Sequence, residues 1–365
     1  MAKSIAVVGA SGVVGEEILL VMQELGLMPS ELFLISSPRT AGEKREFAGK
    51  KYTLLELKPG LLKELKADIV FLCAGGAVSE KYAQEAIDAG SLVIDNSSFF
   101  RMHETVPLVV PECNLDDVKK HQGLIANPNC SSIQMAQVLA PLDKEFDLLR
   151  ADVATYQAAS GAGKDGMEEL VTSLQSFFAF NLSEFAPKAF AYPLALNLIP
   201  QIDVFMPSGF TKEEEKMIYE VQKIMHKQIP IAATCVRVPV LRSHSEALTL
   251  KFARPVSADE ARAVLKCAAG VIVVDDKEAL TANDERYVIK GDFKDRVEAH
   301  RYPMPLFVAD TNYTYVGRIR SDVYDPSILH LWCVADQIRV GAATNAVRIA
   351  LAAIDEGVVG KGSGK

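Results

Sequence analysis

The sequence predicts an α/β protein with two domains. The N-terminal domain is built on a parallel sheet, and the second is an α+β domain with a mixed, largely antiparallel sheet. The chain has 365 residues, which is more than one hydrophobic core usually serves. Its first third alternates short apolar runs with segments of helical periodicity. After Leu149 this alternation gives way to strands separated by long, variable segments.

The N-terminal domain is expected to alternate strands and helices. Its strands are the β-branched, apolar runs at residues 4–9, 32–36, 68–73, 92–94 and 124–126. Helices are expected where apolar residues recur at helical spacing, over residues 12–25, 79–89 and 130–140. Repeated strand–helix units predict parallel strands with helices on both faces of the sheet.

The second domain is expected to be less regular. Its strands are predicted at residues 152–157, 234–240, 247–252 and 270–274. Segment 185–208 is predicted to be irregular but packed, and the polar segment 282–305 to loop over the surface. A terminal helix at 339–353 is too apolar to stand in water, so we expect it to return to the first domain. The predicted domains are 1–129 plus 339–359 and 130–338, with a disordered tail at 360–365.

Composition and charge argue against several functional classes. The net charge of -8 gives no electrostatic reason to expect nucleic acid or an anionic membrane as a partner. No apolar run approaches the roughly 18 residues of a membrane span, and the N-terminus lacks a secretory pattern, so a cytoplasmic setting is expected. The cysteines form no C-x-x-C pair and the histidines are scattered, so neither a disulfide framework nor a metal site is expected.

A glycine-rich turn joins the first predicted strand to the first helix. Its pattern is G-x-x-G-x-x-G, which is looser than G-x-G-x-x-G. Glycines here let the backbone approach a pyrophosphate, and the helix N-terminus supplies amides and partial positive charge. The strand–turn–helix context favours a Rossmann-like dinucleotide-binding domain over a turn without a ligand. The candidate contacts are Gly9, Ser11, Gly12, Val13, Val14 and Gly15.

The end of the second strand favours NADP over NAD. An NAD-binding domain usually places Asp or Glu there for the ribose 2′-hydroxyl. This chain has hydroxyls and a guanidinium instead, which suit a 2′-phosphate, although an ordinary polar turn would also contain them. The residues are Ser36, Ser37, Arg39 and Thr40.

A second glycine-rich stretch at residues 160–166 resembles a P-loop but fails its pattern. Ala158 stands where the first glycine would be, and Asp165 replaces the hydroxyl residue that holds magnesium. ATP binding is therefore not expected. The amides of Ser160 and Gly161 are candidates for lining a cofactor pocket.

Cys130 is the candidate nucleophile. It follows a buried strand and opens a helix, at the edge of a parallel sheet where ligands collect. Amides and the helix dipole at that position favour the thiolate, which is the reactive form. The alternative is a small buried apolar residue, and this interpretation is kept for the other cysteines.

His244 is the candidate general acid/base. It is expected just after a strand, among polar residues. A lone histidine is more often structural, but Arg237 lies only seven positions earlier and suits bidentate binding of a carboxylate. Together they predict a site for an anionic substrate.

Several stretches, including Asn-Cys at a helix start and the Arg-x6-His spacing, identify a family. The chain resembles aspartate-β-semialdehyde dehydrogenases over nearly its full length. The matching stretches are residues 9–15, 95–101, 110–114, 127–132, 157–161, 213–216, 237–244, 317–322 and 341–345.

The resemblance implies a role for each matching residue. Cys130 would be the nucleophile, His244 the acid/base and Gln157 the residue that orients the acyl intermediate, while Asn129 would help to place the reacting carbonyl. Arg237 would hold the substrate α-carboxylate and Glu213 its α-amino group, with Glu214 as a rival for that role. Arg101 and Lys216 would bind phosphate, and Asn345 would contact the nicotinamide.

The implied reaction is the NADPH-dependent reductive dephosphorylation of β-aspartyl phosphate to aspartate β-semialdehyde. It would lie on the branch toward lysine, methionine and threonine. A homodimer, or a tetramer, is expected. The alternatives are a related reductase acting on malonyl-CoA or N-acetyl-γ-glutamyl phosphate and, in another class, a non-catalytic NADP-binding sensor.

Overall fold

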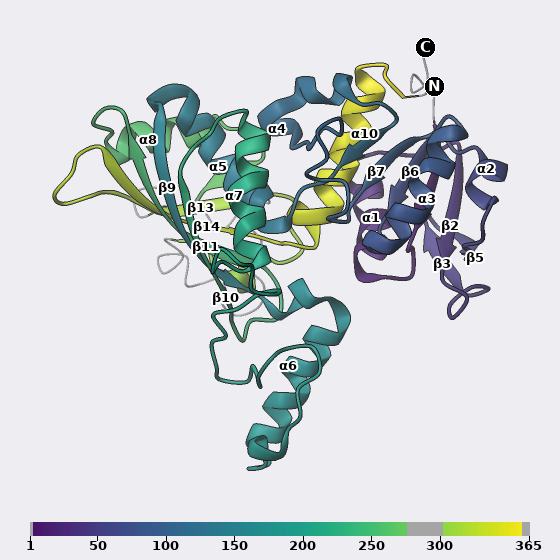
Figure 1. The fold of residues 1–365 in the computed structure, drawn as a ribbon, viewed down its shortest axis with the longest axis horizontal. Coiled ribbons are helices and arrows are strands. Elements are labelled where there is room, and N and C mark those ends of the chain that lie inside the picture. Colours follow the sequence, from purple (N-terminus) through teal and green to yellow (C-terminus); the bar gives the residue numbers. More distant parts are fainter. Residues whose placement is uncertain (1–2, 276–301, 360–365) are drawn as a thin grey trace. The chain divides into compact units, whose positions relative to one another are not determined.

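The computed structural model describes residues 3–275 and 302–359, and it divides into two compact units (Figure 1). The first comprises Met1–Asn129 and Gly341–Lys365, and the second comprises Cys130–Val340. The predicted tail at 360–365 and most of the predicted loop at 282–305 lie outside the described residues. No helix of the described residues is long and apolar enough to span a membrane.

The first unit contains a six-stranded sheet in the order β5-β2-β1-β6-β7-β8, and every neighbouring pair is parallel, as predicted. Its strands are β1 (Ser4–Val8), β2 (Glu31–Ser36), β5 (Leu55–Glu56), β6 (Ile69–Leu72), β7 (Leu92–Asp95) and β8 (Leu124–Ala126). A separate antiparallel hairpin, β3 (Lys44–Phe47) with β4 (Lys50–Thr53), was not predicted, because its residues are mostly polar and exposed.

Helices cover both faces of this sheet. Ile5 and Val7 of β1 point into a core that also contains side chains of α1 and α10, whereas Ala6 and Val8 point into a second core with α3. This alternation is the period of two expected for a strand buried on both sides. The helices are α1 (Val13–Glu24), α2 (Leu61–Leu65), α3 (Gly76–Asp88), α4 (Pro111–Asn114), the 3-10 helix η1 (Leu115–Lys120) and α10 (Asn345–Asp355).

The second unit contains a mixed sheet in the order β10-β9-β11-β14-β13-β12. Its outer pairs are parallel and the three inner pairs antiparallel, which confirms the predicted fold class. The strands are β9 (Leu148–Gln157), β10 (Ile231–Arg237), β11 (His244–Phe252), β12 (Val271–Val273), β13 (Thr314–Ser321) and β14 (Ile328–Ala335).

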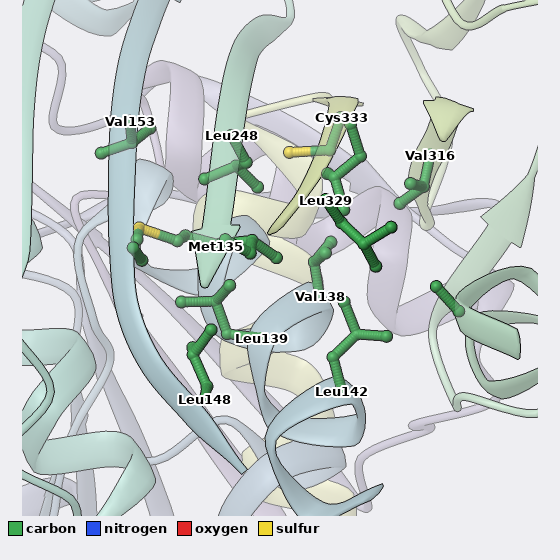
Figure 2. Close-up of a cluster of buried hydrophobic side chains, with 14 of the residues drawn as sticks. Met135, Val138, Leu139, Leu142, Leu148, Val153, Leu248, Val316, Leu329 and Cys333 are labelled. Carbon is green, nitrogen blue, oxygen red and sulfur yellow. The ribbon is translucent and has the colours of Figure 1, made fainter. Parts of the chain in front are cut away.

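One face of this sheet is covered by α5 (Cys130–Phe146), α7 (Lys212–Met225) and α8 (Ala258–Lys266). Figure 2 shows Met135, Val138 and Leu139 of α5 beside Val153 of β9 and Leu248 of β11. The remaining helices are the 3-10 helix η2 (Ala159–Ala162), α6 (Gly163–Phe178), the 3-10 helix η3 (Leu182–Glu184) and α9 (Pro305–Val308).

Several predicted boundaries were wrong, and three of them concern the elements that carry Cys130, Arg237 and His244. The helix at 130–140 continues past Pro141 to Phe146, because burial of Leu142 and Phe146 outweighs one lost backbone hydrogen bond. The strand at 234–240 is β10, which ends at Arg237. His244 begins β11 instead of following a strand, because polar residues occupy the buried start of that strand.

Two predicted segments differ in character. The terminal helix begins as a π-helix, η5 (Arg339–Thr344), before α10, and hydrophobic periodicity does not distinguish the two. Segment 185–208 is mostly irregular, as predicted, but it is only partly packed. Leu194 and Ile199 are buried, whereas Tyr192 and Phe205 are 63% and 61% exposed.

Candidate active site

Three predicted site residues lie at one edge of the second unit's sheet. Arg237 ends β10 directly opposite Gln157, which ends the parallel strand β9. β11 runs antiparallel to β9, so its first residue, His244, lies at the same edge. The side chains of all three point to the face that α5 covers, because they share the strand parity of buried residues in that core.

His244 is fully buried and held in one tautomer. Its Nδ1 accepts a 3.0 Å hydrogen bond from the backbone N–H of Ala158, so in the neutral ring the proton resides on Nε2. Burial, reinforced by the charge of Arg237, lowers the pKa of His244 well below its usual value. Nε2 has no hydrogen-bond partner among the described residues. The ring can therefore offer Nε2–H to a reacting oxygen.

Arg237 is anchored beside His244. Its Nη1 donates a 2.6 Å hydrogen bond to the carbonyl oxygen of Ala158. Burial lowers the pKa of the Arg237 guanidinium, and this is opposed by the negative charges of Glu213 and the Cys130 thiolate. Arg237 therefore supplies a desolvated cation close to the predicted nucleophile.

Glu213 and Lys216 form a small ionic network next to Gln157. Lys216 Nζ lies 3.0 Å from Oε2 of Glu213 and 3.0 Å from Oδ2 of Asp203. Gln157 Nε2 donates to Oε1 of Glu213 at 3.3 Å. Although burial lowers the pKa of the Lys216 ammonium, Glu213 and Asp203 raise it overall. The network places a positive and a negative charge beside the end of the sheet where Gln157 lies.

The structure distinguishes Glu213 from its rival, Glu214. One carboxylate oxygen of Glu214 accepts the N–H of Thr211 in a capping box at the start of α7, and the other accepts the N–H of Cys235. Both oxygens are therefore engaged by the backbone. Glu213 faces Gln157 and Lys216 instead.

Cys130 is half-buried and is the first residue of the 17-residue helix α5. Amides and partial positive charge at a helix start favour a thiolate. By contrast, burial raises the pKa of the thiols of Cys73, Cys113, Cys235 and Cys333. Cys267 is exposed and lies just after α8.

Sequence reasoning missed two residues of this edge. Ala158 acts through its backbone, which leaves no side-chain signal in a sequence. Gln337 accepts the N–H of Ser243 at 2.8 Å and donates to Oγ of Ser160, so it joins two loops of the site. Gln337 follows β14 among apolar and polar residues of no recognised pattern.

The glycines assigned to a cofactor fall in different places. Gly161 lies in the second unit, where an added Cβ would come within 2.6 Å of Arg237 Nη1 and 3.2 Å of His244 Nε2. In the first unit, Gly9 has φ +90°, and an added Cβ would meet the carbonyl oxygen of Cys73 at 2.8 Å. At Gly15 it would lie 2.2 Å from the carbonyl oxygen of Gly9. The chain thus tolerates no side chain at Gly9, in the turn before α1, or at Gly15, in the first turn of α1.

The predicted cofactor residues 11–14 and 36–40 lie around this turn. Gly12 is the N-cap of α1, and Val13 and Val14 are its first residues. Ser36 ends β2, with Ser37 and Arg39 exposed in the loop after it. Oγ of Ser11 lies 3.0 Å from Oγ1 of Thr40, which ties that loop to the glycine turn.

Asn127 of the first unit accepts hydrogen bonds from two more predicted residues. Arg101 Nε donates to its carbonyl oxygen at 2.9 Å, and Asn345 Nδ2 donates to its Oδ1 at 2.7 Å. Asn345 Nδ2 also donates to the carbonyl oxygen of Val109, while its buried Oδ1 has no partner among the described residues. Asn129 is buried and precedes Cys130 in the chain.

No group of three or more His, Cys, Asp or Glu side chains within residues 3–275 and 302–359 could hold a metal ion.

Comparison with known proteins identifies relatives of the whole chain. Residues 4–121 match the family model of the semialdehyde dehydrogenase NAD-binding domain, and residues 139–340 match that of the semialdehyde dehydrogenase dimerisation domain. The aspartate-semialdehyde dehydrogenase of Campylobacter jejuni is 57% identical over 95% of this chain and 96% of its own. That of Aquifex aeolicus is 43% identical, over 98% and 100%.

Solved structures give the same result. The crystal structure of aspartate semialdehyde dehydrogenase II from Vibrio cholerae, complexed with ASA, superposes with a TM-score of 0.87 at 36% identity. The match covers 98% of this chain and 99% of that one.

Proposed function

The chain belongs to the aspartate-semialdehyde dehydrogenase family, and we propose that it reduces β-aspartyl phosphate to aspartate β-semialdehyde with NADPH, releasing phosphate. The observation that carries this proposal is the arrangement of Arg237 and His244. Both are anchored on Ala158, and the negative charge of the Cys130 thiolate opposes the lowering of the Arg237 pKa that burial causes. An acid/base group and a carboxylate-binding cation therefore share one end of the sheet, within electrostatic reach of the proposed nucleophile.

Cys130 forms the covalent intermediate. Its thiolate attacks the acyl carbon, the bond to the phosphate oxygen breaks, and phosphate leaves. The thioester that remains is a good hydride acceptor, because sulfur donates weakly into the carbonyl. Covalent catalysis of this kind divides one difficult step into two easier ones. When bound, NADPH supplies the hydride that reduces this acyl group.

His244 stabilises the oxyanion of the second half of the reaction. Reduction of the thioester leaves a tetrahedral oxyanion that accepts a hydrogen bond from Nε2–H, and collapse of this oxyanion forms the aldehyde and expels the thiolate of Cys130. The bond from Ala158 to Nδ1 keeps the proton on Nε2. Asn129 and Gln157 position the reacting carbonyl.

The polar ends of the substrate have separate partners. Arg237 binds the α-carboxylate and Glu213 the α-ammonium group, while Lys216 and Arg101 bind phosphate. These local charges allow a chain of net charge -8 to hold an anionic substrate. A malonyl-CoA reductase would have no substrate amine for Glu213, and an N-acetyl-γ-glutamyl phosphate carries its amine acylated.

The glycine turn fits a dinucleotide. Glycine at positions 9 and 15 allows the chain to pack tightly around the start of α1. A pyrophosphate would bind at the N-terminus of α1 and contact Ser11, Gly12, Val13 and Val14. Ser36, Ser37, Arg39 and Thr40 would bind the 2′-phosphate of NADP. The orphaned Oδ1 of Asn345 would accept a hydrogen bond from the nicotinamide amide. Ser160 and Gly161 are further proposed contacts of the cofactor.

A homodimer formed through the second unit is part of this proposal. Residues 139–340 match a family model described as a dimerisation domain. Large apolar side chains of this unit are exposed, at Tyr156, Tyr192, Leu198, Leu241 and Leu306. Sedimentation velocity would return the mass of a dimer. A mass equal to the 39.7 kDa chain would contradict it.

The six cysteines are all thiols, in keeping with the cytoplasmic setting we propose.

The activity is tested in the reverse direction with aspartate semialdehyde, phosphate and NADP. We expect turnover by the wild type and none above background by Cys130→Ala. Arg237→Ala should raise KM for the semialdehyde strongly while NADP binding, measured by fluorescence titration, stays unchanged. NADP binding without turnover would leave the chain a cofactor sensor, and activity of Cys130→Ala would refute the mechanism.

A further inference from the structure

We infer that Phe190 is a positioning residue that determines how tightly Arg237 binds the substrate carboxylate, and that Glu169 holds Phe190 in place. The inference extends the proposed function, because it rests on Arg237 as the carboxylate-binding residue. It introduces two side chains, both in the segment between β9 and β10, to which the proposed mechanism assigns no role. Their effect is on substrate affinity and selectivity.

Phe190 packs against the guanidinium of Arg237. The centre of the guanidinium lies 5.7 Å from the centroid of the Phe190 ring. A cation within about 6 Å of an aromatic face is attracted by the ring's quadrupole, and more strongly where both are removed from water. Arg237 is only 6% exposed and Phe190 is half-buried, so the cation's side of this contact is desolvated. The ring also keeps water from that side of the cation.

Other groups restrict the same guanidinium. The carbonyl oxygen of Ala158 accepts from Nη1, and Gly161 approaches so closely that a Cβ there would lie 2.6 Å from Nη1. The backbone of Arg237 is also fixed to the segment that carries Phe190. Ile199 and Arg237 exchange N–H···O bonds of 3.0 Å and 2.8 Å. The segment from Phe190 to Ile199 thus contacts both the side chain and the main chain of Arg237.

Glu169 fixes the start of this segment. Its Oε2 accepts the N–H groups of Lys188 and Ala189, both at 2.6 Å, and its Oε1 accepts the N–H of Phe190 at 3.2 Å. Glu169 lies on α6 and is 7% exposed. Three N–H groups converging on one buried carboxylate make a charge-assisted anchor for a segment with no regular structure.

The helix beside Glu169 leaves space for the ring. An added Cβ at Gly166 would come within 3.1 Å of Cζ of Phe190. The ring also packs on a small apolar cluster that includes Ala159, Leu170 and Ile199. Backbone anchoring and ring packing therefore agree on one position for Phe190, over the guanidinium. A carboxylate bound by Arg237 gains from this arrangement, because the cation is already ordered before the substrate arrives.

The experiment compares steady-state kinetics of purified full-length variants in the reverse reaction. Phe190→Leu keeps an apolar side chain but loses the π face, and we expect KM for aspartate semialdehyde to rise roughly tenfold with kcat changed less than about threefold. KM for NADP and phosphate should not change. Phe190→Tyr, which keeps the ring, should remain within about threefold of the wild type. Phe177→Leu, on the same helix as Glu169, is the matched control.

Substrate selectivity separates this role from a general structural one. 3-Aminopropanal is the semialdehyde without its α-carboxylate, so it makes no use of Arg237. Phe190→Leu should lower kcat/KM for the semialdehyde but leave that for 3-aminopropanal unchanged. Combined with Arg237→Lys, it should add no further loss of carboxylate selectivity, because both changes act on one interaction. Equal losses for the two aldehydes would overturn the inference.

Glu169→Gln tests the anchor. Loss of the carboxylate charge should raise KM for the semialdehyde several-fold without changing 3-aminopropanal turnover, whereas Glu168→Gln, at the exposed neighbouring position, should have no effect. An unchanged KM in both Phe190→Leu and Glu169→Gln would overturn the inference and leave the proposed function intact. Failure of the wild type to turn over the semialdehyde would instead refute the proposed function.

Discussion

The backbone N–H of Ala158 donates a 3.0 Å hydrogen bond to Nδ1 of His244. The carbonyl oxygen of the same residue accepts from Nη1 of Arg237 at 2.6 Å. One peptide segment after β9 therefore sets the tautomer of His244, the proposed acid/base group, and the position of Arg237, the proposed carboxylate-binding cation. Disturbing this segment should affect both functions together.

His244 should keep its neutral form in mildly acidic solution. Burial and Arg237 lower its pKa in the folded protein, so the acid limb of kcat/KM should lie below pH 6.5. The unfolded chain takes up this proton near pH 6.5 and the folded protein does not, so stability should fall as the pH drops below that value.

His244→Asn should lower kcat by roughly 10²- to 10⁴-fold and remove this contribution to stability. An inflection at or above pH 6.5 in a ring-nitrogen NMR titration of His244 would contradict the prediction.

Thiol labelling that substrate can block should single out Cys130. Burial raises the pKa of Cys73, Cys113, Cys235 and Cys333, so these thiols should resist iodoacetamide at neutral pH. Mass spectrometry of the labelled protein should find Cys130 and the exposed Cys267 modified. Aspartate semialdehyde should protect Cys130 alone, and Cys267→Ser should remain fully active. Labelling of Cys130 that substrate does not slow would argue against its role.

Gly161→Ala should impair catalysis without unfolding the protein. The new Cβ would meet Nη1 of Arg237 and the ring of His244, which are buried and cannot withdraw freely. We expect kcat/KM to fall by about 10²-fold, because small displacements of positioned groups have effects of this size. Gly76→Ala is the control, since its Cβ would make only an ordinary 3.7 Å contact with Phe99. Full activity of Gly161→Ala would show that the loop can move aside.

The parallel sheet could be predicted from the sequence because its strands are buried on both faces. Each then reads as a short apolar run, such as Ile69–Leu72, set between helical periods. β13 escaped prediction because glycine, arginine and serine interrupt its apolar residues, as in Thr314–Ser321. α6 escaped because its glycine-rich start resembles a loop.

Only side chains of the candidate site could be proposed from the sequence, and its backbone contacts could not. Cys130, His244 and Arg237 carry chemistry that residue type and spacing reveal. The peptide groups of Ala158 carry none, and Phe190 lies in an irregular segment far from Arg237 in sequence. Such residues act through tertiary position, which a local pattern does not encode.

Arg39 should determine the preference for NADP. It is exposed in the loop after β2, and Thr40 ties this loop to the glycine turn through Ser11. Arg39→Ala should raise KM for NADP about tenfold, the loss expected for one charge-assisted contact with the 2′-phosphate, and leave KM for NAD unchanged. Lys44→Ala, a charge change on the nearby strand β3, is the control. Equal effects on the two cofactors would place the 2′-phosphate elsewhere.

Glu246 should make the protein less stable as the pH rises. This fully buried carboxyl lies two residues after His244, and the Cys333 thiol donates to its Oε2 at 3.4 Å. Burial raises the pKa of Glu246 from 4.5 to about 8. Between these values the folded protein retains a proton that the unfolded chain releases, so stability declines with increasing pH. The total loss by pH 8 is at most of the order of 5 kcal/mol.

Glu246→Gln is neutral at every pH and should escape this loss. Its advantage in denaturation midpoint over the wild type should grow from pH 5 to pH 8 and then level off, because above pH 8 both states of the wild type are ionised. The titratable neighbours Cys333, on β14, and Cys235, on β10, keep raised pKa values and should stay protonated through this range. Glu215→Gln, on α7, controls for loss of a carboxylate elsewhere. Parallel stability curves for Glu246→Gln and the wild type would contradict the prediction. They would mean that Glu246 is ionised in the folded protein and that a cation or water, rather than Cys333, stabilises its charge.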